Sequence, residues 1–183
     1  MDAFETLVAQ LMQREGYWVI NSFKVELTKA EKKEIGRPSS PRWELDLIAY
    51  NPQKKNLRII ECKSYLDSID VKSKSFSDGA RLSGRYKLFT DIKLRQIVFS
   101  RLKTQLEDMG MILENTNIQL CLAAGKVATD IDRKELHEIF SAKQWLLFDE
   151  EWIISRLRIL SSGRYDNTVE SIVSKLIYRN MKL

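Results

Sequence analysis

Two acidic side chains and one basic side chain that could act together lie close in the sequence: Asp46, Glu61 and Lys63. Two carboxylates and an ammonium among apolar neighbours are costly to bury unless each charge finds a partner. The ammonium can compensate one carboxylate, and a bound divalent cation could compensate the second. The set therefore suits metal-dependent chemistry, and a structural Asp–Lys or Glu–Lys ion pair is the alternative.

The element that must position these groups spans residues 43–63. Both halves of this stretch are rich in strand-forming residues, and a polar turn containing Asn51, Pro52 and Asn56 separates them. This pattern predicts a β-hairpin.

Strand geometry decides whether the three side chains can meet. Alternate side chains of a strand share a face, so we expect Glu44, Asp46 and Ile48 to point the same way. Glu61 and Lys63 share a face of the second strand for the same reason. If the hairpin turns these two faces to the same side, the two carboxylates and the ammonium converge.

A strand aspartate followed on the next strand by Glu-x-Lys resembles the PD-(D/E)xK nuclease superfamily, whose fold is restriction-endonuclease-like. Asp46 matches the first acidic position, although Leu45 stands where the motif has proline, and Glu61-Cys62-Lys63 matches the second half. The resemblance implies an endonuclease that hydrolyses phosphodiester bonds, DNA being the expected substrate, with Mg²⁺ or Mn²⁺ as cofactor. It also implies metal ligation by Asp46, Glu61 and the carbonyl of Cys62. Lys63 would orient the attacking water or stabilise developing charge, or it would act as a base if burial near a metal lowers its pKa.

The start of the chain predicts an amphipathic helix that Asp2 caps and Gly16 ends, followed by a strand over residues 17–26. Its pattern, F-E-x-L-V-x-x-L-x-x-x-x-G-Y, is similar to the opening helix of Holliday-junction resolvases and of the catalytic domains of methyl-directed restriction enzymes. In that group a glutamate of the first helix often joins the metal site, which implies this role for Glu5. The alternative is a surface glutamate that the helix dipole favours near an N-terminus.

Basic residues follow the hairpin. The net charge is +5, and the stretch from 81 to 103 contains one acid, Asp91, beside a series of basic residues: Arg81, Arg85, Lys87, Lys93, Arg95, Arg101 and Lys103. Such asymmetry suits a side of the protein that faces a polyanion. The alternative is a solvated helix surface. The expected nucleic-acid contacts are Arg42, Ser64, Arg85, Lys93 and Arg95.

The remaining pattern predicts a single α/β domain. Residues 27–42 are expected as a charged loop and residues 64–77 as irregular. Helices are expected at 81–89, 92–109, 132–142 (with Asp132-x-x-Glu135 as a capping box), 150–161 and 168–179, and strands at 118–124 (buried on both faces) and 145–148. The result is a restriction-endonuclease-like αβββαβ core over about residues 1–125, with a central mixed sheet flanked by helices and a C-terminal α-β-α-α extension.

Several other classes of protein are disfavoured. No apolar run approaches the roughly 20 residues that cross a bilayer, so no membrane contact is expected, and the start lacks a signal-peptide pattern. Cys62 and Cys121 fall in predicted strands, which favours buried thiols in a reducing cytoplasm. The single histidine, His137, lies on a predicted acidic helix, which disfavours histidine-centred nuclease chemistry and zinc binding.

Two alternatives to a nuclease stay open. The chain can be a catalytically inactive nuclease-fold protein that binds nucleic acid or another protein, or a metal-independent scaffold subunit. A homodimer is also left open. The sequence does not specify whether the substrate is branched, modified or sequence-specific DNA, or RNA.

Overall fold

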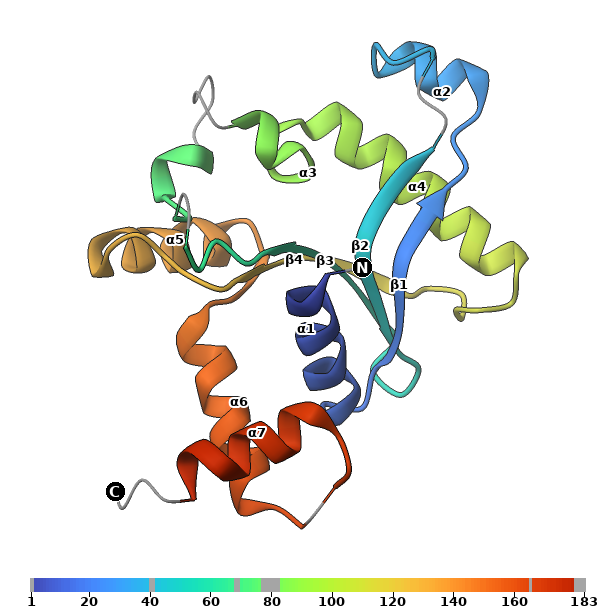
Figure 1. The fold of residues 1–183 in the computed structure, drawn as a ribbon. Coiled ribbons are helices and arrows are strands. Elements are labelled where there is room, and N and C mark those ends of the chain that lie inside the picture. Colours follow the sequence, from blue (N-terminus) through green and yellow to red (C-terminus); the bar gives the residue numbers. More distant parts are fainter. Residues whose placement is uncertain (1, 40–41, 68–69, 77–82, 165, 180–183) are drawn as a thin grey trace.

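The computed structural model describes residues 2–39, 42–67, 70–76, 83–164 and 166–179. A mixed sheet lies at its centre, with five strands in the order β1-β2-β3-β4-β5 (Figure 1). The strands are β1 (Trp18–Val25), β2 (Trp43–Asn51), β3 (Asn56–Lys63), β4 (Asn117–Ala124) and β5 (Leu146–Phe148). The first three strands pair antiparallel, and β3, β4 and β5 pair parallel.

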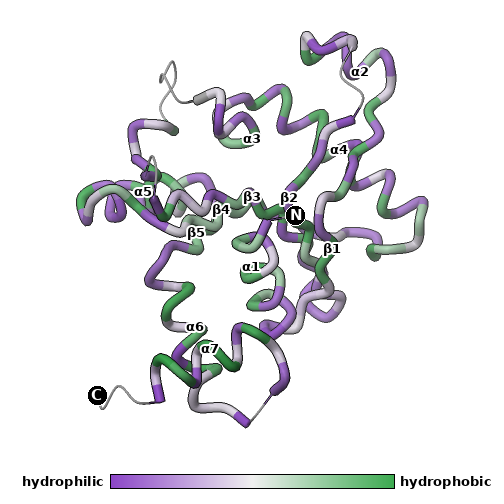
Figure 2. The backbone as a smooth tube through the Cα atoms, in the orientation of Figure 1, coloured by the Kyte–Doolittle hydropathy of each residue, from purple (hydrophilic) through white to green (hydrophobic). Residues whose placement is uncertain are grey.

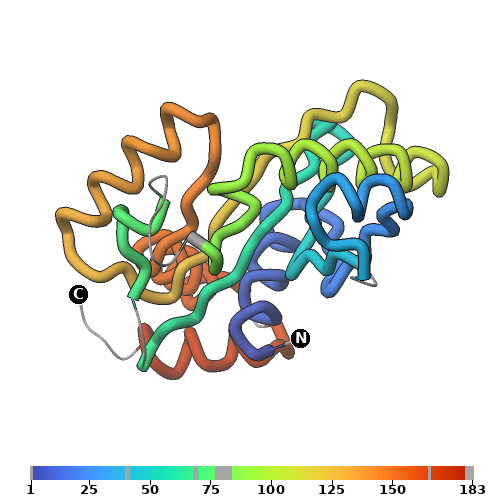
Figure 3. Tube along the Cα trace, turned by 90° about the horizontal axis from the view of Figure 1, so that it is seen from above, coloured from blue at the N-terminus to red at the C-terminus, as the bar shows by residue number. Residues whose placement is uncertain are grey.

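Helices cover both faces of the sheet. They are α1 (Ala3–Arg14), α2 (Lys29–Glu34), α3 (Lys87–Thr90), α4 (Ile92–Asp108), α5 (Asp130–Ala142), α6 (Glu150–Ser162) and α7 (Val169–Tyr178). The expected αβββαβ order and the α-β-α-α extension are confirmed, with the short helix α2 as an addition and the short helix α3 within the region where a helix was expected at 81–89. Figure 3, a view from above, shows α4 running across the strands.

Two apolar clusters sandwich the sheet. On one face Ile59 packs in a cluster with Val98 of α4 and Phe140 of α5. On the other face Ile60 packs in a cluster with Val8 of α1. Figure 2 shows hydrophobic residues concentrated on the strands at the centre of the molecule. Strand β4 contributes to both clusters, so its expected burial on both faces is confirmed.

The predicted hairpin is confirmed as β2 and β3. The side chain of Asn51 stabilises its turn, because Asn51 Oδ1 accepts the backbone N–H of Lys54 at 3.0 Å. Asn51 Nδ2 also donates to the carbonyl of Gly16 at 3.0 Å, which fixes the end of α1 against the hairpin. Gly16 has a φ of +83°, a conformation that glycine adopts without strain.

The expected face alternation along β2 is wrong in one respect. Leu45 and Ile48 both pack in the cluster on the α4 face, although side chains three residues apart in a regular strand point to opposite faces. The alternation of side chains between the two faces of the sheet is therefore interrupted between Leu45 and Ile48, next to Asp46. On the neighbouring strand, Ser22 has a φ of +52°, and Ile20 and Phe23 on either side of it also contact one cluster. The pairing of β1 with β2 also skips Ser22 and Asp46, so both strands are irregular at this level of the sheet.

Three other expectations need correction. The predicted loop over residues 27–42 contains α2, because Thr28 and Glu31 form a capping box. The helix expected at 81–89 is a 3₁₀ turn, Ser83–Arg85, followed by α3, while residues 81–82 lie outside the described part. Helix α5 begins earlier than the Asp132 capping box implied, because Thr129 is its N-cap and accepts the N–H of Asp132.

Helix α7 packs in an unusual orientation. It buries Ser171 and Ser174, while its apolar side chains are exposed: Val169, Ile172, Val173, Leu176 and Ile177. This helix thus presents an uncovered apolar face.

Among the described residues, no helix is both long enough and apolar enough to cross a membrane.

Candidate active site

Strands β2 and β3 diverge at the level of Asp46. Their pairing ends at Leu47 and Ile60, whereas β3 stays paired with β4 as far as Lys63. In the gap, Asp46 Oδ2 accepts the backbone N–H of Cys62 at 2.8 Å. A buried N–H needs an acceptor, so the aspartate replaces a strand carbonyl at this position.

The expected convergence of Asp46, Glu61 and Lys63 is confirmed. Lys63 Nζ lies 3.1 Å from Glu61 Oε1 and 3.9 Å from Asp46 Oδ2. The three side chains are only 18–28% exposed. One ammonium thus faces two carboxylates, which leaves the cluster with a negative charge.

The electrostatics of the cluster reflect this imbalance. Burial raises the pKa of Glu61, and repulsion from Asp46 adds to this effect, while Lys63 opposes it. For Lys63, burial would lower the pKa, but attraction from Glu61 and Asp46 is stronger in sum and raises it. The lysine is therefore an ammonium while both carboxylates face it.

Cys62 offers its carbonyl oxygen, but not its sulfur, as a candidate ligand. Its thiol is buried in the cluster on the α1 face. Burial raises the pKa of this thiol, and the negative charges of Asp46 and Glu5 raise it further, so it stays protonated. A protonated thiol is a poor metal ligand, since the thiolate is the binding form.

A small cavity adjoins the two carboxylates. It has a volume of about 30 Å³, and Asp46, Glu61 and Leu88 of α3 are among the residues that line it. A cavity of this size admits a particle as large as a water molecule.

Glu5 lies at the N-terminus of α1, near this cluster. Its Oε2 accepts the N–H of Asp2 at 3.2 Å, and Asp2 Oδ1 accepts the N–H of Glu5 at 2.7 Å, so the two residues form a capping box. Burial raises the pKa of Glu5, and the charge of Asp46 is among the further causes. The capping role is part of the fold, and metal ligation by Glu5 stays a prediction.

The donor atoms at this site can be compared with the ligands that the expected Mg²⁺ or Mn²⁺ ion would require. Within the described ranges, no group of three or more His, Cys, Asp or Glu side chains is arranged to hold a metal ion. The carboxylates of Asp46 and Glu61 and the carbonyl of Cys62 are nonetheless oxygen donors, which Mg²⁺ prefers. With the net negative charge and the adjoining cavity, this set fits a small divalent cation in chemical type.

Two further features near the site were not anticipated. Gly125 follows β4 and donates its N–H to the carbonyl of Lys63 at 2.9 Å. A Cβ at this position would collide with the carbonyl of Ser64, so only glycine fits.

Tyr86 is buried near Glu61, and burial together with the neighbouring Tyr65 raises its pKa. The glycine could have been suspected from its place after an apolar strand, but nothing in the sequence indicated the tyrosine.

The expected nucleic-acid contacts lie on several segments of the chain. Ser64 is partly buried directly after Lys63, and Arg85 is exposed at the end of the 3₁₀ turn that precedes α3. Arg42 lies 3.1 Å from Glu26, and Lys93 lies 3.5 Å from Glu34. Their contact with nucleic acid stays a prediction.

Two basic residues of α4 have strong intramolecular partners. Arg95 Nη1 donates to the carbonyls of Leu88 and Phe89 at 2.8 and 3.0 Å. Arg101 forms a two-pronged ion pair with Glu31, with Nη2 2.7 Å from Oε1. Arg101 therefore joins α4 to α2. Arg81 lies outside the described residues.

His137 lies on α5, as expected, away from the carboxylate cluster. Its side chain is 56% exposed, and its Nε2 is 3.3 Å from Oδ2 of the buried Asp149. The pair lies where α5 meets the start of α6, and it has no contact with Asp46 or Glu61 among the interactions of the described residues.

Comparisons with known proteins add little to this description. No family model and no curated protein matches the chain. A solved structure described as a protein of unknown function, AF1548, is 12% identical, with a TM-score of 0.43, and the match covers 89% of this chain and 71% of that one. A likeness of this degree does not bear on activity.

Proposed function

We propose that this chain is a metal-dependent nuclease of the PD-(D/E)xK type that hydrolyses phosphodiester bonds, DNA being its expected substrate. One observation carries the proposal: Asp46, Glu61 and Lys63 meet where β2 and β3 diverge, with Lys63 Nζ within 3.9 Å of both carboxylates. Two partly buried carboxylates with one ammonium are a costly arrangement for a merely structural ion pair.

The donor set suggests how a cation would be held. Asp46, Glu61 and the carbonyl of Cys62 would bind it, with Glu5 as a further ligand expected from the sequence. A bound Mg²⁺ or Mn²⁺ would supply Lewis acidity and lower the pKa of a water molecule at the scissile phosphate. The hydrogen bond from the Cys62 N–H holds the Asp46 carboxylate in place for this role.

Lys63 has the most defined role among the protein groups. Its pKa is raised by Glu61 and Asp46, so it carries a positive charge at neutral pH. An ammonium can donate hydrogen bonds to the attacking water or to a phosphate oxygen on which charge develops. We assign positioning and charge stabilisation to Lys63; a role as general base would require a cation bound by Glu61 and Asp46 to lower this pKa.

A catalytically inactive nuclease-fold protein that binds nucleic acid or protein is the second candidate. It is favoured by the absence, within the described part of the chain, of three side-chain ligands arranged for a metal. A panel of linear, branched and modified DNA and of RNA, incubated with Mg²⁺, Mn²⁺ or a chelator, separates the two functions. Cation-dependent cleavage supports the nuclease, and binding without cleavage supports the second candidate.

Salt dependence of binding tests the proposed phosphate contacts. Lys93 is 60% exposed and only loosely paired with Glu34, so it can reach a phosphate. Replacing Lys93 with Gln should flatten the plot of log affinity against log salt by about one unit. Arg101→Gln is the matched control on the same helix, because the Arg101 side chain is held by Glu31. Equal slopes for wild type and Lys93→Gln would remove Lys93 from the interface.

We also propose that the chain can form a homodimer. A homodimer would have an apolar surface to use, since α7 exposes several aliphatic side chains. Sedimentation equilibrium of the wild type and of Leu176→Ser would test whether copies associate through this face.

A further inference from the structure

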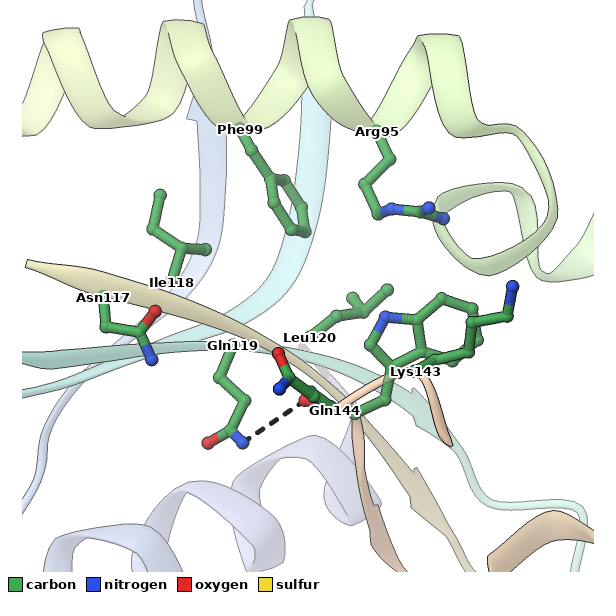
Figure 4. A pocket seen from close by; sticks show the side chains of 9 residues that line it. Arg95, Phe99, Asn117, Ile118, Gln119, Leu120, Lys143 and Gln144 are labelled. Atoms are coloured by element: carbon green, nitrogen blue, oxygen red, sulfur yellow. Dashed lines mark hydrogen bonds between the residues drawn. The ribbon is translucent and has the colours of Figure 1, made fainter. Parts of the chain in front are cut away.

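A second cavity lies toward the opposite end of β4 from the carboxylate cluster. It has a volume of about 450 Å³ and lies between α4 and the first half of β4 (Figure 4). The cavity is lined by Asn117–Leu120 of β4, whereas Lys63 pairs with Ala124 at the other end of this strand, so at least four residues of β4, roughly 13 Å at the usual rise of a strand, separate the cavity from Lys63. The volume falls within the range of small-molecule sites, roughly 300–1,000 Å³.

The lining of this cavity is cationic. Arg95 and Lys143 line it, and none of its described lining residues is acidic. Arg95 is partly buried, and burial lowers its pKa, with only a weak opposing effect from Asp91. Its hydrogen bonds within the described residues come from Nη1 alone, so Nη2 and Nε can serve a ligand. Two cations without a facing carboxylate favour an anionic ligand.

The cavity also has a rigid aromatic wall. The guanidinium of Arg95 lies over the indole of Trp145, 5.2 Å from the ring centroid. Figure 4 shows Phe99 projecting from the same helix as Arg95. The indole is held by edge-to-face contacts with Phe89 and Phe140, at centroid distances of 5.2 and 5.5 Å. A fixed aromatic surface next to cations suits a ligand that combines a flat ring with negative charge.

Hydrogen-bonding groups lie along the edge of this cavity. Asn117 and Gln119 alternate along β4 with Ile118 and Leu120, which pack on the α4 face, so the two amide side chains point to the opposite face of the sheet. Gln119 Nε2 donates there to the carbonyl of Gln144 at 3.4 Å. Strand β5 pairs with β4 only over Cys121–Ala123, so among the described residues the first half of β4 has no strand partner on that side. Its backbone groups can pair with the donors and acceptors of a heterocyclic ring.

We propose that this cavity binds a nucleotide, with its base at the free edge of β4 beside Trp145 and its phosphate at Arg95 and Lys143. The ligand can be a free mononucleotide or the phosphorylated end of a nucleic-acid strand. Both sources share the same chemistry. This binding does not depend on cleavage at Glu61.

The test is a titration of the full chain, in buffer with chelator, with each of the four ribonucleoside 5′-monophosphates, followed by tryptophan fluorescence and calorimetry. Saturable binding is expected, at least about tenfold tighter than for the matching nucleosides or for inorganic phosphate, because each of these lacks one half of the contacts. A 5′-phosphorylated tetranucleotide distinguishes the sources: tighter binding than the monophosphate indicates a strand end, and equal or weaker binding a free nucleotide.

Two variants locate the site. Lys143→Gln and Arg95→Gln should each weaken nucleotide binding about tenfold, as expected for the loss of a charge-assisted contact. Because Arg95 also holds the end of α3, the exposed Lys143 provides the variant with no such structural contact. Lys134→Gln, an exposed position on α5, is the matched control and should leave binding unchanged.

Three results would overturn the proposal. They are the absence of saturable binding by all four monophosphates, inorganic phosphate binding as tightly as the nucleotides, and unchanged affinity in Lys143→Gln. Since the titrations contain no divalent cation, a failed nuclease assay leaves them unaffected.

Discussion

Asp46 accepts the backbone N–H of Cys62 across the gap between β2 and β3, with 2.8 Å between oxygen and nitrogen. This contact fixes the first carboxylate of the cluster beside the peptide whose carbonyl is a candidate ligand. It also explains how two strands can separate inside a sheet without leaving this N–H unpaired.

The hydrogen bond at Asp46 predicts a difference between two variants. Asp46→Asn keeps an oxygen that can accept the Cys62 N–H, whereas Asp46→Ala leaves that N–H without a partner. Both remove the same charge, so the difference between them isolates the hydrogen bond. Asp46→Ala should be less stable than Asp46→Asn by about 1–3 kcal/mol in urea unfolding. Equal unfolding free energies would show that the bond does not stabilise the fold.

Lys63→Met tests the role of the ammonium. Without it the cluster is more negative, so affinity for Mn²⁺ should stay the same or rise, while the single-turnover cleavage rate falls by roughly 10²-fold or more. Calorimetry and cleavage assays measure the two effects, and Lys24→Met, an exposed change on β1, is the control. A loss of Mn²⁺ affinity without a loss of rate would contradict the assignment.

Glu5 has a capping role in the fold and a proposed role at the metal, and two variants separate them. Glu5→Gln keeps a side chain that can close the capping box, and Glu5→Ala does not. Only Glu5→Ala should lower stability, by about 0.5–1 kcal/mol. Both should weaken Mn²⁺ binding, by about tenfold if the carboxylate is a ligand. Unchanged Mn²⁺ affinity in Glu5→Gln would leave Glu5 with its capping role alone.

The Glu31–Arg101 pair predicts a dependence of stability on pH. Burial alone would raise the pKa of Glu31, but hydrogen bonds from Arg101 and Thr28 more than compensate and lower it from its ordinary value of 4.5. A carboxyl whose pKa is lowered in the folded state stabilises the fold at neutral pH, and this contribution is lost as the pH falls below 4.5 through the folded-state pKa.

The free energy of unfolding of wild type and Arg101→Gln should therefore differ at pH 7, by about 1 kcal/mol or less for a partly exposed pair, and converge at low pH. Lys93→Gln is the control, because it breaks an exposed pair between the same two helices. A difference that persists unchanged at about pH 3, well below the ordinary pKa of a glutamate, would show that it does not arise from the titration of Glu31.

The parts of the fold that depend on local pattern could be predicted from the sequence. The hairpin followed from turn residues and strand propensity, and Asn51 indeed closes its turn. Helix α2 could also have been found, since Thr28-x-x-Glu31 is a capping-box signature within the stretch interpreted as a loop.

Other features depend on contacts between distant segments and could not be read from the sequence. The interrupted face alternation beside Asp46 coincides with the positive φ of Ser22 and with the positions that the β1–β2 pairing skips, Ser22 and Asp46. The pairing of Arg101 with Glu31 joins residues seventy positions apart. A series of basic residues therefore gave an overestimate of the charge free to meet a polyanion.

Cation-dependent cleavage by variants of the two acidic residues Glu61 and Glu138 decides the function. Glu61 faces Lys63, whereas Glu138 is an exposed residue of α5 and serves as the control. Wild type and Glu138→Gln should cleave nucleic acid with Mg²⁺ or Mn²⁺ and not with chelator, and Glu61→Gln should be at least about 10²-fold slower. Cleavage by Glu61→Gln at the wild-type rate, or wild-type cleavage that persists in chelator, would contradict the proposed site.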